Sequence, residues 1–316
     1  MHFAWLDSVH PVLRERLESA GMECSDALHV GREDILAGAG ARWDGIVLRS
    51  RITVDVPLLD ALPQLKCIAR SGSGLENIDV AAALTRGIQV VNSPEGNRDA
   101  VAEHAMGMLL MLLHRLRSAD ASVRAGRWER EAHRGRELGS RTVAIVGFGH
   151  TGEAFARRLQ SFGCRGLAVD PYRHDLSAAA ASCGAEPVRL EEALQLADAV
   201  SFHVPLTPET RGLVNAAFVS SLRPGTVLIN TSRGPVVDTA AVLDALDSGH
   251  LAGAGFDVLE FEEASLEKIR GGSATLARLQ NHPEVVLSPH VAGWTQESYV
   301  RLSDVLADKI LAAFCA

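Results

Sequence analysis

The glycine-rich run at residues 147–152, Gly-Phe-Gly-His-Thr-Gly, constrains the fold most because of the segments on either side of it. The apolar residues 142–146 lead into it and predict a buried strand, and residues 153–159 leave it with the pattern of a helix. Residues 166–169 then predict a second strand that ends in Asp170. Strand, glycine turn, helix and a second strand with a terminal acid together form the fingerprint of a dinucleotide-binding βαβ unit.

Each part of this fingerprint has a physical task. Gly147 permits the tight turn, Gly149 lets a pyrophosphate approach the backbone, and Gly152 lets the helix pack closely on the strand. The helix N-terminus offers N–H groups and a partial positive charge to phosphates. Asp170 is placed to accept hydrogen bonds from a ribose diol, and a glycine turn without a ligand would leave that acid unexplained. We expect NAD rather than NADP because Asp170 would repel a 2′-phosphate, although Arg173 is close enough in the chain to soften this preference.

Length and composition limit the class of protein. A chain of 316 residues is long for one hydrophobic core, and 47% hydrophobic with 22% charged residues is typical of a globular protein. The longest apolar stretch, residues 105–113, is too short to span a membrane, and the formal net charge of −8 argues against nucleic-acid binding. Five scattered cysteines without metal-ligand spacing predict reduced thiols and no metal site. The N-terminus shows no secretory signal, so we expect a cytoplasmic protein.

Strand and helix alternate along the whole chain, which predicts an α/β protein with parallel sheets and helices on both sheet faces. Residues 99–116 predict a helix too apolar for a surface helix, so we expect it to be buried between domains or subunits. Residues 126–139 are polar and irregular and are interpreted as a linker, and helical periodicity returns at residues 295–314. The predicted strands are residues 3–6, 45–48, 65–69, 88–91, 142–146, 165–169, 198–202, 226–230, 251–256 and 284–287.

Three chemically complementary side chains follow predicted strands in the second half of the chain. Arg233, Glu262 and His290 come after the strands that end near positions 230, 256 and 287. Because ligands bind outside the carboxyl ends of parallel strands, we expect the three to meet at one sheet edge, facing the dinucleotide. An arginine fork matches a carboxylate, and a histidine titrates near neutrality and exchanges protons with a hydroxyl or carbonyl oxygen. With a nicotinamide alongside, the set suits hydride transfer between an alcohol and a ketone that carry a neighbouring carboxylate.

Each of these residues also has an ordinary alternative. Arg233 alone is also compatible with a surface arginine, Glu262 with a solvated carboxylate among neighbouring glutamates, and His290 with a loop histidine bonded to backbone. Only their common position at one sheet edge favours the functional interpretation.

Short motifs also occur in a fixed order along the chain. They are residues 92–97 (Asn-Ser-Pro-Glu-Gly-Asn), 101–104 (Val-Ala-Glu-His), 146–152, 203–210 (His-Val-Pro-Leu-Thr-Pro-Glu-Thr), 230–234 (Asn-Thr-Ser-Arg-Gly), 256–258 (Phe-Asp-Val) and 288–290 (Ser-Pro-His). In this order and spacing the chain resembles the D-isomer-specific 2-hydroxyacid dehydrogenases over nearly its full length. Residues 93–98 and 289–295 are similar to the short phosphoglycerate-dehydrogenase-like branch. The resemblance implies an NAD-dependent oxidoreductase that interconverts a D-2-hydroxy acid and its 2-keto acid.

The resemblance also implies roles for individual residues. Arg233 would bind the substrate and polarise its carbonyl, His290 would be the acid and base, and Glu262 would be its carboxylate partner. Asp170 would hold the adenosine ribose and Asp257 the nicotinamide carboxamide. The other cofactor-binding positions implied are Gly147, Gly149, His150, Thr151, Gly152, His203, Val204, Pro205, Thr231, Ser232 and Gly293. The substrate-binding positions implied are Arg70, Ser71, Gly72, Ser73 and Asn97.

The division of the chain follows from the same resemblance. Residues 1–97 plus 288–316 would form a substrate domain and residues 98–287 an inserted NAD-binding domain, both Rossmann-like doubly wound parallel sheets. A cleft between the domains would close on the substrate and exclude water. The helix at residues 99–116 would form part of a homodimer interface, and its alternative is a hinge helix within one chain. The expected partners are a small 2-hydroxy or 2-keto acid, with no nucleic acid and no membrane.

Several points stay open. Family members usually carry a proline after the catalytic glutamate, whereas Glu263 follows Glu262 here, so Glu260 and Glu263 remain alternatives. The same fold serves as a dinucleotide-sensing binding module in the C-terminal-binding co-repressors, and a methyltransferase with a similar glycine loop explains the later strand-end residues poorly. Glyoxylate, hydroxypyruvate, pyruvate-like acids and 3-phosphoglycerate are all candidate substrates. A phosphorylated substrate needs cationic groups, for which the candidates are Arg51, Arg70, Arg98, Arg134 and Arg136.

Overall fold

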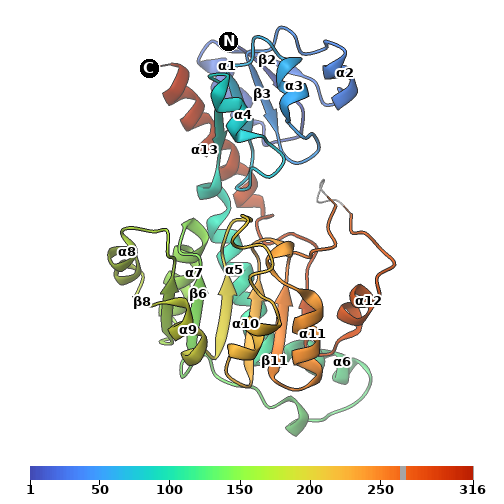
Figure 1. Ribbon diagram of the computed structural model, residues 1–316, viewed down its shortest axis with the longest axis vertical. Helices are drawn as coiled ribbons and strands as arrows, with labels where there is room; N and C mark the ends of the chain where they lie inside the picture. The colour runs from blue at the N-terminus through green and yellow to red at the C-terminus, as the bar shows by residue number, and fades with distance from the viewer. Residues whose placement is uncertain (264–267, 316) are drawn as a thin grey trace. The chain divides into compact units, whose positions relative to one another are not determined.

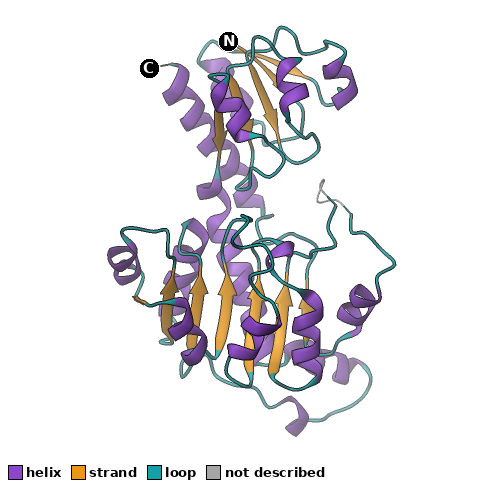
Figure 2. Cartoon of the chain, in the orientation of Figure 1, coloured by secondary structure: helices purple, strands orange, loops and turns teal. Residues whose placement is uncertain are grey.

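A computed structural model describes residues 1–263 and 268–315 (Figure 1, Figure 2). The chain forms two compact units. Of the described residues, unit 1 contains 1–97 and 294–315, and unit 2 contains Arg98–Glu263 and Lys268–Gly293. Among the described residues, no helix combines the length and the apolar character that crossing a membrane requires.

Unit 1 is built on a five-stranded sheet with the strand order β2-β1-β3-β4-β5, and all of its strand pairs are parallel. Its strands are β1 (His2–Trp5), β2 (Glu23–Asp26), β3 (Gly45–Leu48), β4 (Cys67–Arg70) and β5 (Gln89–Asn92). Its helices are α1 (Val12–Ser19), α2 (Arg32–Leu36), α3 (Val56–Asp60), α4 (Val80–Thr85) and α13 (Gln296–Phe314).

Alternate residues of these strands supply two hydrophobic cores, one on each face of the sheet. Ile46 and Leu48 of β3 pack with the buried residues of α2, α3 and α4. Val47, between them, packs with those of α1 and α13, including Leu306 and Ile310. Helices therefore cover both faces, as expected for a doubly wound sheet.

Unit 2 is built on a seven-stranded parallel sheet with the order β12-β11-β10-β9-β6-β7-β8. The chain runs outward from β6 to β8, returns to the other side of β6 with β9, and continues outward to β12. Neighbouring strands β6 and β9 thus mark the switch point at which α/β sheets bind ligands. The strands are β6 (Thr142–Val146), β7 (Arg165–Val169), β8 (Ala185–Pro187), β9 (Ala199–Phe202), β10 (Thr226–Asn230), β11 (Leu251–Phe256) and β12 (Val285–Leu287).

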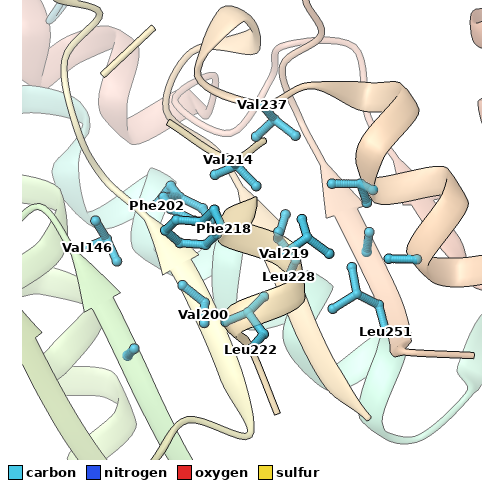
Figure 3. Packing of buried hydrophobic residues seen from close by; sticks show 14 of the residues in the cluster. Val146, Val200, Phe202, Val214, Phe218, Val219, Leu222, Leu228, Val237 and Leu251 are labelled. Carbon is cyan, nitrogen blue, oxygen red and sulfur yellow. The ribbon is translucent and has the colours of Figure 1, made fainter. Parts of the chain in front are cut away.

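Two cores cover the faces of this sheet as well. On one face Val200, Phe202 and Leu228 pack with α9 (Leu190–Leu196), α10 (Ala216–Ser221), α11 (Thr239–Asp247) and α12 (Ala274–Asn281), and Figure 3 shows the Phe202 and Phe218 side chains at its centre. On the other face Ile145 and Ile229 pack with α5 (Pro94–Leu113), α7 (His150–Gln160) and α8 (Leu176–Ser182). The two all-parallel sheets confirm the predicted α/β fold class.

The helix predicted at residues 99–116 is α5, which begins earlier, at Pro94, and ends at Leu113. From Ala102 onward its buried residues belong to the core of unit 2 itself, among them Met106 and Leu109. Much of the apolar character of α5 is thus explained by packing within this unit. Arg115, with a left-handed φ of 53°, separates α5 from α6 (Leu116–Arg124), which the sequence had not predicted.

The structure also contains two strands that the sequence had not predicted, β2 and β8. Both are edge strands of their sheets. Strand β2 has the polar sequence Glu-Cys-Ser-Asp, and β8 is three residues long and ends in Pro187. Edge strands of this kind lack the buried apolar run on which a sequence prediction depends.

Candidate functional site

The glycine turn after β6 is held by two close backbone approaches. Gly147 has a φ of +91°, and a Cβ atom there would lie 2.5 Å from the carbonyl oxygen of His203. A Cβ atom at Gly152 would lie 2.2 Å from the carbonyl oxygen of Gly147. Among the described residues, apart from the chain neighbours of Gly149 and the α7 backbone, nothing lies within 4 Å of the corresponding point at Gly149, the N-cap of α7. The turn therefore has no room for a side chain at Gly147 and Gly152, whereas the space beside Gly149 is free for an approaching group.

A cavity of about 400 Å³ lies at the N-terminus of α7. Asp170 is one of the lining residues and fixes the turn, because its carboxylate accepts the backbone N–H groups of Phe148 at 2.9 Å and Tyr172 at 3.1 Å. A helix N-terminus next to a fixed acid can receive a phosphate and a ribose in one site. The cavity is lined by Phe148, Gly149, His150, Glu153, Asp170, Tyr172 and Arg173.

Two buried polar atoms lie at the ends of β9 and β10. Burial lowers the pKa of His203 to about 3, so its ring is neutral. Its Nε2 lies 2.9 Å from Ser201 Oγ, while its Nδ1 has no hydrogen-bond partner in the described part of the chain. Among the same described residues, Thr231 Oγ1 is also buried without a partner. Buried polar atoms are normally paired, so these two atoms fit a site that receives a polar ligand.

Arg233 follows β10 in a turn that Asn230 folds. The Asn230 side chain accepts the N–H and hydroxyl of Ser232, at 3.0 and 2.7 Å, and donates to the carbonyl of Arg233 at 2.9 Å. The next residue, Gly234, packs so closely on the backbone of Leu259 that a Cβ atom would lie 2.0 Å from it. This contact brings the turn that carries Arg233 against the loop after β11.

Glu262 and His290 meet beyond β11 and β12. His290 Nδ1 lies 2.7 Å from Glu262 Oε2, and the Glu262 Oε1 atom accepts the backbone N–H of Leu259 at 2.5 Å. His290 has a left-handed φ of 54°, and its own N–H donates to the Asp257 carbonyl at 2.7 Å. A left-handed non-glycine residue is uncommon and persists where its surroundings hold it in place.

The structure distinguishes Glu262 from the other glutamates considered as its alternatives. Glu260 accepts the backbone N–H of Thr239 at 3.1 Å, at the N-terminus of α11. Glu263 is exposed, and its backbone N–H bonds to the carbonyl of Lys268. The next glutamate, Glu267, lies outside the described residues.

The loop at residues 288–292 is organised by the buried carboxylate of Asp257. It accepts the hydroxyl of Ser288 at 2.6 Å and the backbone N–H groups of Val291 and Ala292 at 2.9 and 2.8 Å. His104 Nε2 lies 2.8 Å from the same Ser288 hydroxyl. Asp257 thus links β11 to the loop that carries His290. Sequence reasoning gave no role to His104 or Ser288, although both lie in motifs that it quoted.

The predicted substrate residues gather in unit 1, beyond β4. Gly72 has a φ of +145°, and the Arg70 guanidinium lies directly over it. Gly72 N–H donates to Ser93 Oγ at 3.2 Å, and Ser73 Oγ donates to Asn97 Oδ1 at 2.7 Å. The structure therefore brings together the predicted residues at the end of β4, in the loop after it and in the first turn of α5: Arg70, Ser71, Gly72, Ser73 and Asn97.

Three of the arginines considered for a phosphate group are engaged elsewhere. Arg51 pairs with Asp7 at 3.1 Å. Arg136 donates to the carbonyl of Gly225 at 3.0 Å, just before β10 begins, so it lies at the sheet edge opposite Arg233. Arg134 forms an exposed ion pair two residues earlier.

Comparison with known proteins places these features in a family. The model of the NAD binding domain of D-isomer specific 2-hydroxyacid dehydrogenases matches residues 106–292. A D-3-phosphoglycerate dehydrogenase of Mycobacterium bovis is 38% identical over 280 residues, which are 89% of this chain and 51% of that protein. The chain thus spans about half the length of the curated relatives it matches.

Solved structures agree over the whole chain. The crystal structure of D-lactate dehydrogenase from Aquifex aeolicus, complexed with NAD and lactic acid, has a TM-score of 0.82 at 28% identity and covers 100% of this chain and 95% of that one. A glyoxylate reductase from Paecilomyes thermophila has a TM-score of 0.85 at 25% identity, with coverage of 99% and 95%.

Proposed function

Because the chain belongs to the D-isomer specific 2-hydroxyacid dehydrogenase family of NAD-binding oxidoreductases, we propose that it interconverts a D-2-hydroxy acid and its 2-keto acid. The observation that carries this proposal is the 2.7 Å contact between His290 Nδ1 and Glu262 Oε2. It lies at the carboxyl edge of the parallel sheet of unit 2, the edge to which β6 and β10 also deliver the glycine turn and Arg233.

His290 is proposed as the acid and base. Since Glu262 holds Nδ1, Nε2 is the nitrogen that takes the hydroxyl proton in oxidation and returns a proton to the ketone oxygen in reduction. Glu262 orients the ring by holding Nδ1. Arg233 offers its planar fork to the substrate carboxylate and polarises the carbonyl. When bound, the nicotinamide accepts or donates the hydride.

The cofactor is proposed to be NAD, bound along the same sheet edge. Asp170 would accept the ribose hydroxyls, which favours NAD over NADP, and the N–H groups of His150 and Thr151 would bind the pyrophosphate. The cavity at α7 and the unpartnered buried atoms of His203 and Thr231 support this assignment. The other residues assigned to the cofactor are Gly147, Gly149, Gly152, Val204, Pro205, Ser232, Asp257 and Gly293.

We propose that Arg233 binds the substrate carboxylate and, as the family resemblance implies, that Arg70, Ser71, Gly72, Ser73 and Asn97 are substrate-binding residues. The proposed division of the chain is a substrate domain of residues 1–97 plus 288–316 and an NAD-binding domain of residues 98–287. The relatives named above are named for different acids. We therefore propose only the class of substrate, a short 2-keto acid and its 2-hydroxy acid, and a panel of substrates would identify the side group. That panel is glyoxylate, hydroxypyruvate, pyruvate and the keto acid of 3-phosphoglycerate, each tested with NADH and NADPH.

The decisive experiment compares wild type with His290→Ala. We expect turnover to fall by orders of magnitude on the best substrate while the dissociation constant of NADH changes little. His250→Gln is the matched control, because His250 precedes β11 and so lies at the opposite sheet edge. Unchanged turnover in His290→Ala would reject the assignment. NADH binding without oxidation by any substrate would favour the dinucleotide-sensing module.

The family resemblance also leads us to propose a homodimer. Apolar side chains are exposed on and after α6: Leu116 and Val123 are about half exposed, and Trp128 is 79% exposed. Exposed apolar groups gathered on one segment are typical of interaction surfaces. We expect light scattering to give a dimer for wild type and a monomer for Trp128→Glu. Leu84→Glu, at another exposed apolar position, is the control, and a monomeric wild type would refute the dimer.

A further inference from the structure

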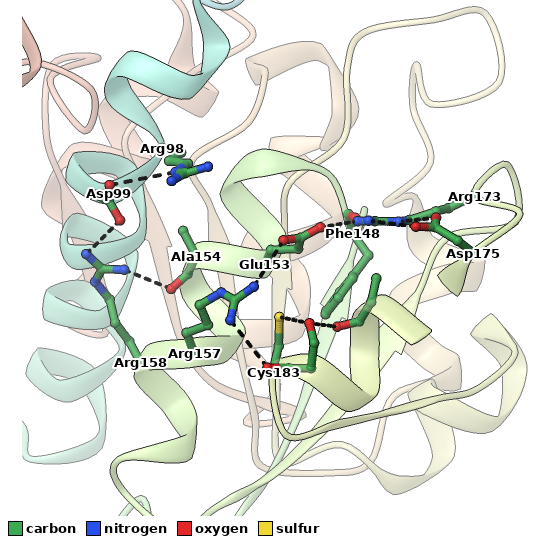
Figure 4. Close-up of polar contacts among 12 residues, drawn as sticks. Arg98, Asp99, Phe148, Glu153, Ala154, Arg157, Arg158, Arg173, Asp175 and Cys183 are labelled. Atoms are coloured by element: carbon green, nitrogen blue, oxygen red, sulfur yellow. Dashed lines mark hydrogen bonds and ion pairs between the residues drawn. The ribbon is translucent and has the colours of Figure 1, made fainter. Parts of the chain in front are cut away.

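An ion-pair cluster lies at the cavity where α7 begins, and Figure 4 shows its members. The Arg173 guanidinium stands between two carboxylates. Its Nη1 lies 2.6 Å from Glu153 Oε1, and its Nε lies 2.8 Å from Asp175 Oδ1. Nη1 also donates to the carbonyl of Phe148, inside the glycine turn. The cluster therefore connects the loop after β7, helix α7 and the turn that we assign to the cofactor.

Arg173 lies at a position where an arginine could bind the 2′-phosphate of a cofactor. It comes three residues after Asp170, the acid assigned to the ribose, and both residues line the same cavity. An arginine near that acid is the residue type that accommodates the 2′-phosphate of NADP in dinucleotide folds. A guanidinium binds a phosphate through a fork of N–H groups. In this structure those groups face Glu153, Asp175 and a backbone carbonyl instead.

The charges around the ribose site follow from this pairing. Asp170, Glu153 and Asp175 are three carboxylates, and Arg173 pairs with two of them, while Arg157 lies 3.5 Å from Glu153 on its other side. The hydrogen bond to Asp175, followed by that to Glu153, raises the pKa of Arg173, and the bond from Arg173 lowers the pKa of the Asp175 carboxyl. The carboxylates outnumber the guanidinium groups here, so the local charge opposes a further anion.

The position of Glu153 gives its pairing with Arg173 a second effect, on the pyrophosphate. It lies in the first turn of α7, where a carboxylate would repel a pyrophosphate bound at the helix N-terminus. Arg173 at 2.6 Å and Arg157 at 3.5 Å neutralise it there. The pairing therefore removes the guanidinium from a 2′-phosphate and at the same time protects the 5′-pyrophosphate from Glu153.

We propose that Glu153 and Asp175 are specificity-determining residues, which hold Arg173 in an ion-pair clamp and so make the ribose site read a 2′-hydroxyl and reject a 2′-phosphate. The clamp is defined as Glu153, Arg173 and Asp175. This inference rests on the proposed nucleotide site. It predicts that removing the two carboxylates turns Arg173 from a clamped residue into a phosphate ligand.

The test uses the full chain and two nucleotide fragments, ADP and adenosine 2′,5′-bisphosphate, whose dissociation constants are measured by calorimetry. Wild type should prefer ADP. In the double variant Glu153→Gln with Asp175→Asn, we expect the preference to shift toward the bisphosphate by about tenfold or more, equivalent to about 1.4 kcal/mol. Adding Arg173→Ala to this double variant should abolish the gain, because the gain requires the released guanidinium.

Two further variants keep the test interpretable. Asp175→Asn alone changes an exposed side chain and should shift the preference in the same direction by a smaller factor, which covers the case in which the double variant fails to fold. Glu186→Gln breaks a comparable exposed pair, Arg165–Glu186, and should leave the preference unchanged.

The outcomes separate the clamp from the site itself. If wild type binds neither fragment, the proposed nucleotide site fails, and the inference fails with it. If wild type prefers ADP and the clamp variants keep the same preference, the site stands and the clamp is refuted. A gain that survives Arg173→Ala would also overturn the proposal, since it would come from lost repulsion alone.

Discussion

His203 makes the stability of unit 2 depend on pH in a way that can be calculated. Its side chain is buried at the end of β9, packed against the Phe155 ring at a centroid distance of 5.1 Å. Burial lowers its pKa from 6.5 to about 3, because the charged imidazolium would lose its hydration. The folded state therefore keeps this histidine neutral between pH 7 and pH 4, while the unfolded state takes up a proton.

The sign and size follow from proton linkage. A group whose folded pKa lies below its unfolded pKa contributes stability that is present above the unfolded value and is lost as the pH falls toward the folded value. With 6.5 in the unfolded chain and about 3 in the folded one, His203 removes about 2 kcal/mol from the free energy of unfolding between pH 7 and pH 5. The loss continues at about 1.4 kcal/mol per pH unit until the pH approaches the folded pKa.

Hydrogen exchange at the amides of β9 and β10 is the suitable assay, because a chain with two compact units need not unfold in one step. His203→Gln removes the titration and keeps a group that can bond Ser201. The difference in unfolding free energy between wild type and His203→Gln should fall by about 2 kcal/mol from pH 7 to pH 5. His29→Gln, which removes an exposed histidine, should run parallel to wild type. Parallel curves for wild type and His203→Gln would refute the reasoning.

Three further predictions concern packing, capping and burial. Gly152→Ala places a Cβ atom 2.2 Å from the Gly147 carbonyl, so we expect calorimetry to show at least a tenfold loss of ADP affinity; unchanged affinity would contradict the assigned turn. Asp238→Ala removes the acceptor for two N–H groups at the start of α11 and should cost about 1 kcal/mol by hydrogen exchange, whereas Asp238→Asn should cost little. Burial raises the pKa of Cys67 to about 12, so a thiol reagent at pH 8 should label the exposed Cys315 and reach Cys67 only on unfolding; rapid native labelling of Cys67 would show the burial to be wrong.

The sequence predicted the interior of both sheets well, for a physical reason. Central parallel strands are buried on both faces, so they appear as short continuous apolar runs such as β6 and β10. The prediction failed at β2 and β8, where an edge strand needs little apolar surface, and at α6, which only two residues separate from the end of α5 at Leu113. A pattern of apolar residues predicts the strands and helices that form a core, but it predicts poorly the strands at the edge of a sheet.

The residue types of the site could also be predicted, because parallel strands deliver side chains to one edge. The family resemblance gave Glu262 as the partner of His290, but the residues alone left Glu260 and Glu263 open as alternatives. Glu260, Glu262 and Glu263 stand within four positions in the sequence, and only the folded loop separates them. Glu260 meets Thr239, and Glu262 meets His290. The path of a loop depends on hydrogen bonds between distant segments, which neither periodicity nor spacing records.

Three carboxylates of unit 2 show why the role of an acidic residue was easier to predict than its hydrogen-bond partners. Asp170 accepts the N–H of Phe148, Asp257 accepts those of Val291 and Ala292, and Glu262 accepts that of Leu259. Each acid proposed to serve a ligand or a catalytic ring therefore also fixes the backbone of a loop at the site. A substitution that removes such an acid changes the chemistry and releases a loop together, so the isosteric amides are the variants that separate the two effects. Asp257→Asn removes the charge and keeps one acceptor oxygen, which can still take the Ser288 hydroxyl and the Val291 N–H, while its NH2 replaces the oxygen that accepts the Ala292 N–H. If the two bonds to the remaining oxygen hold the 288–292 loop, its hydrogen exchange should change less than in Asp257→Ala.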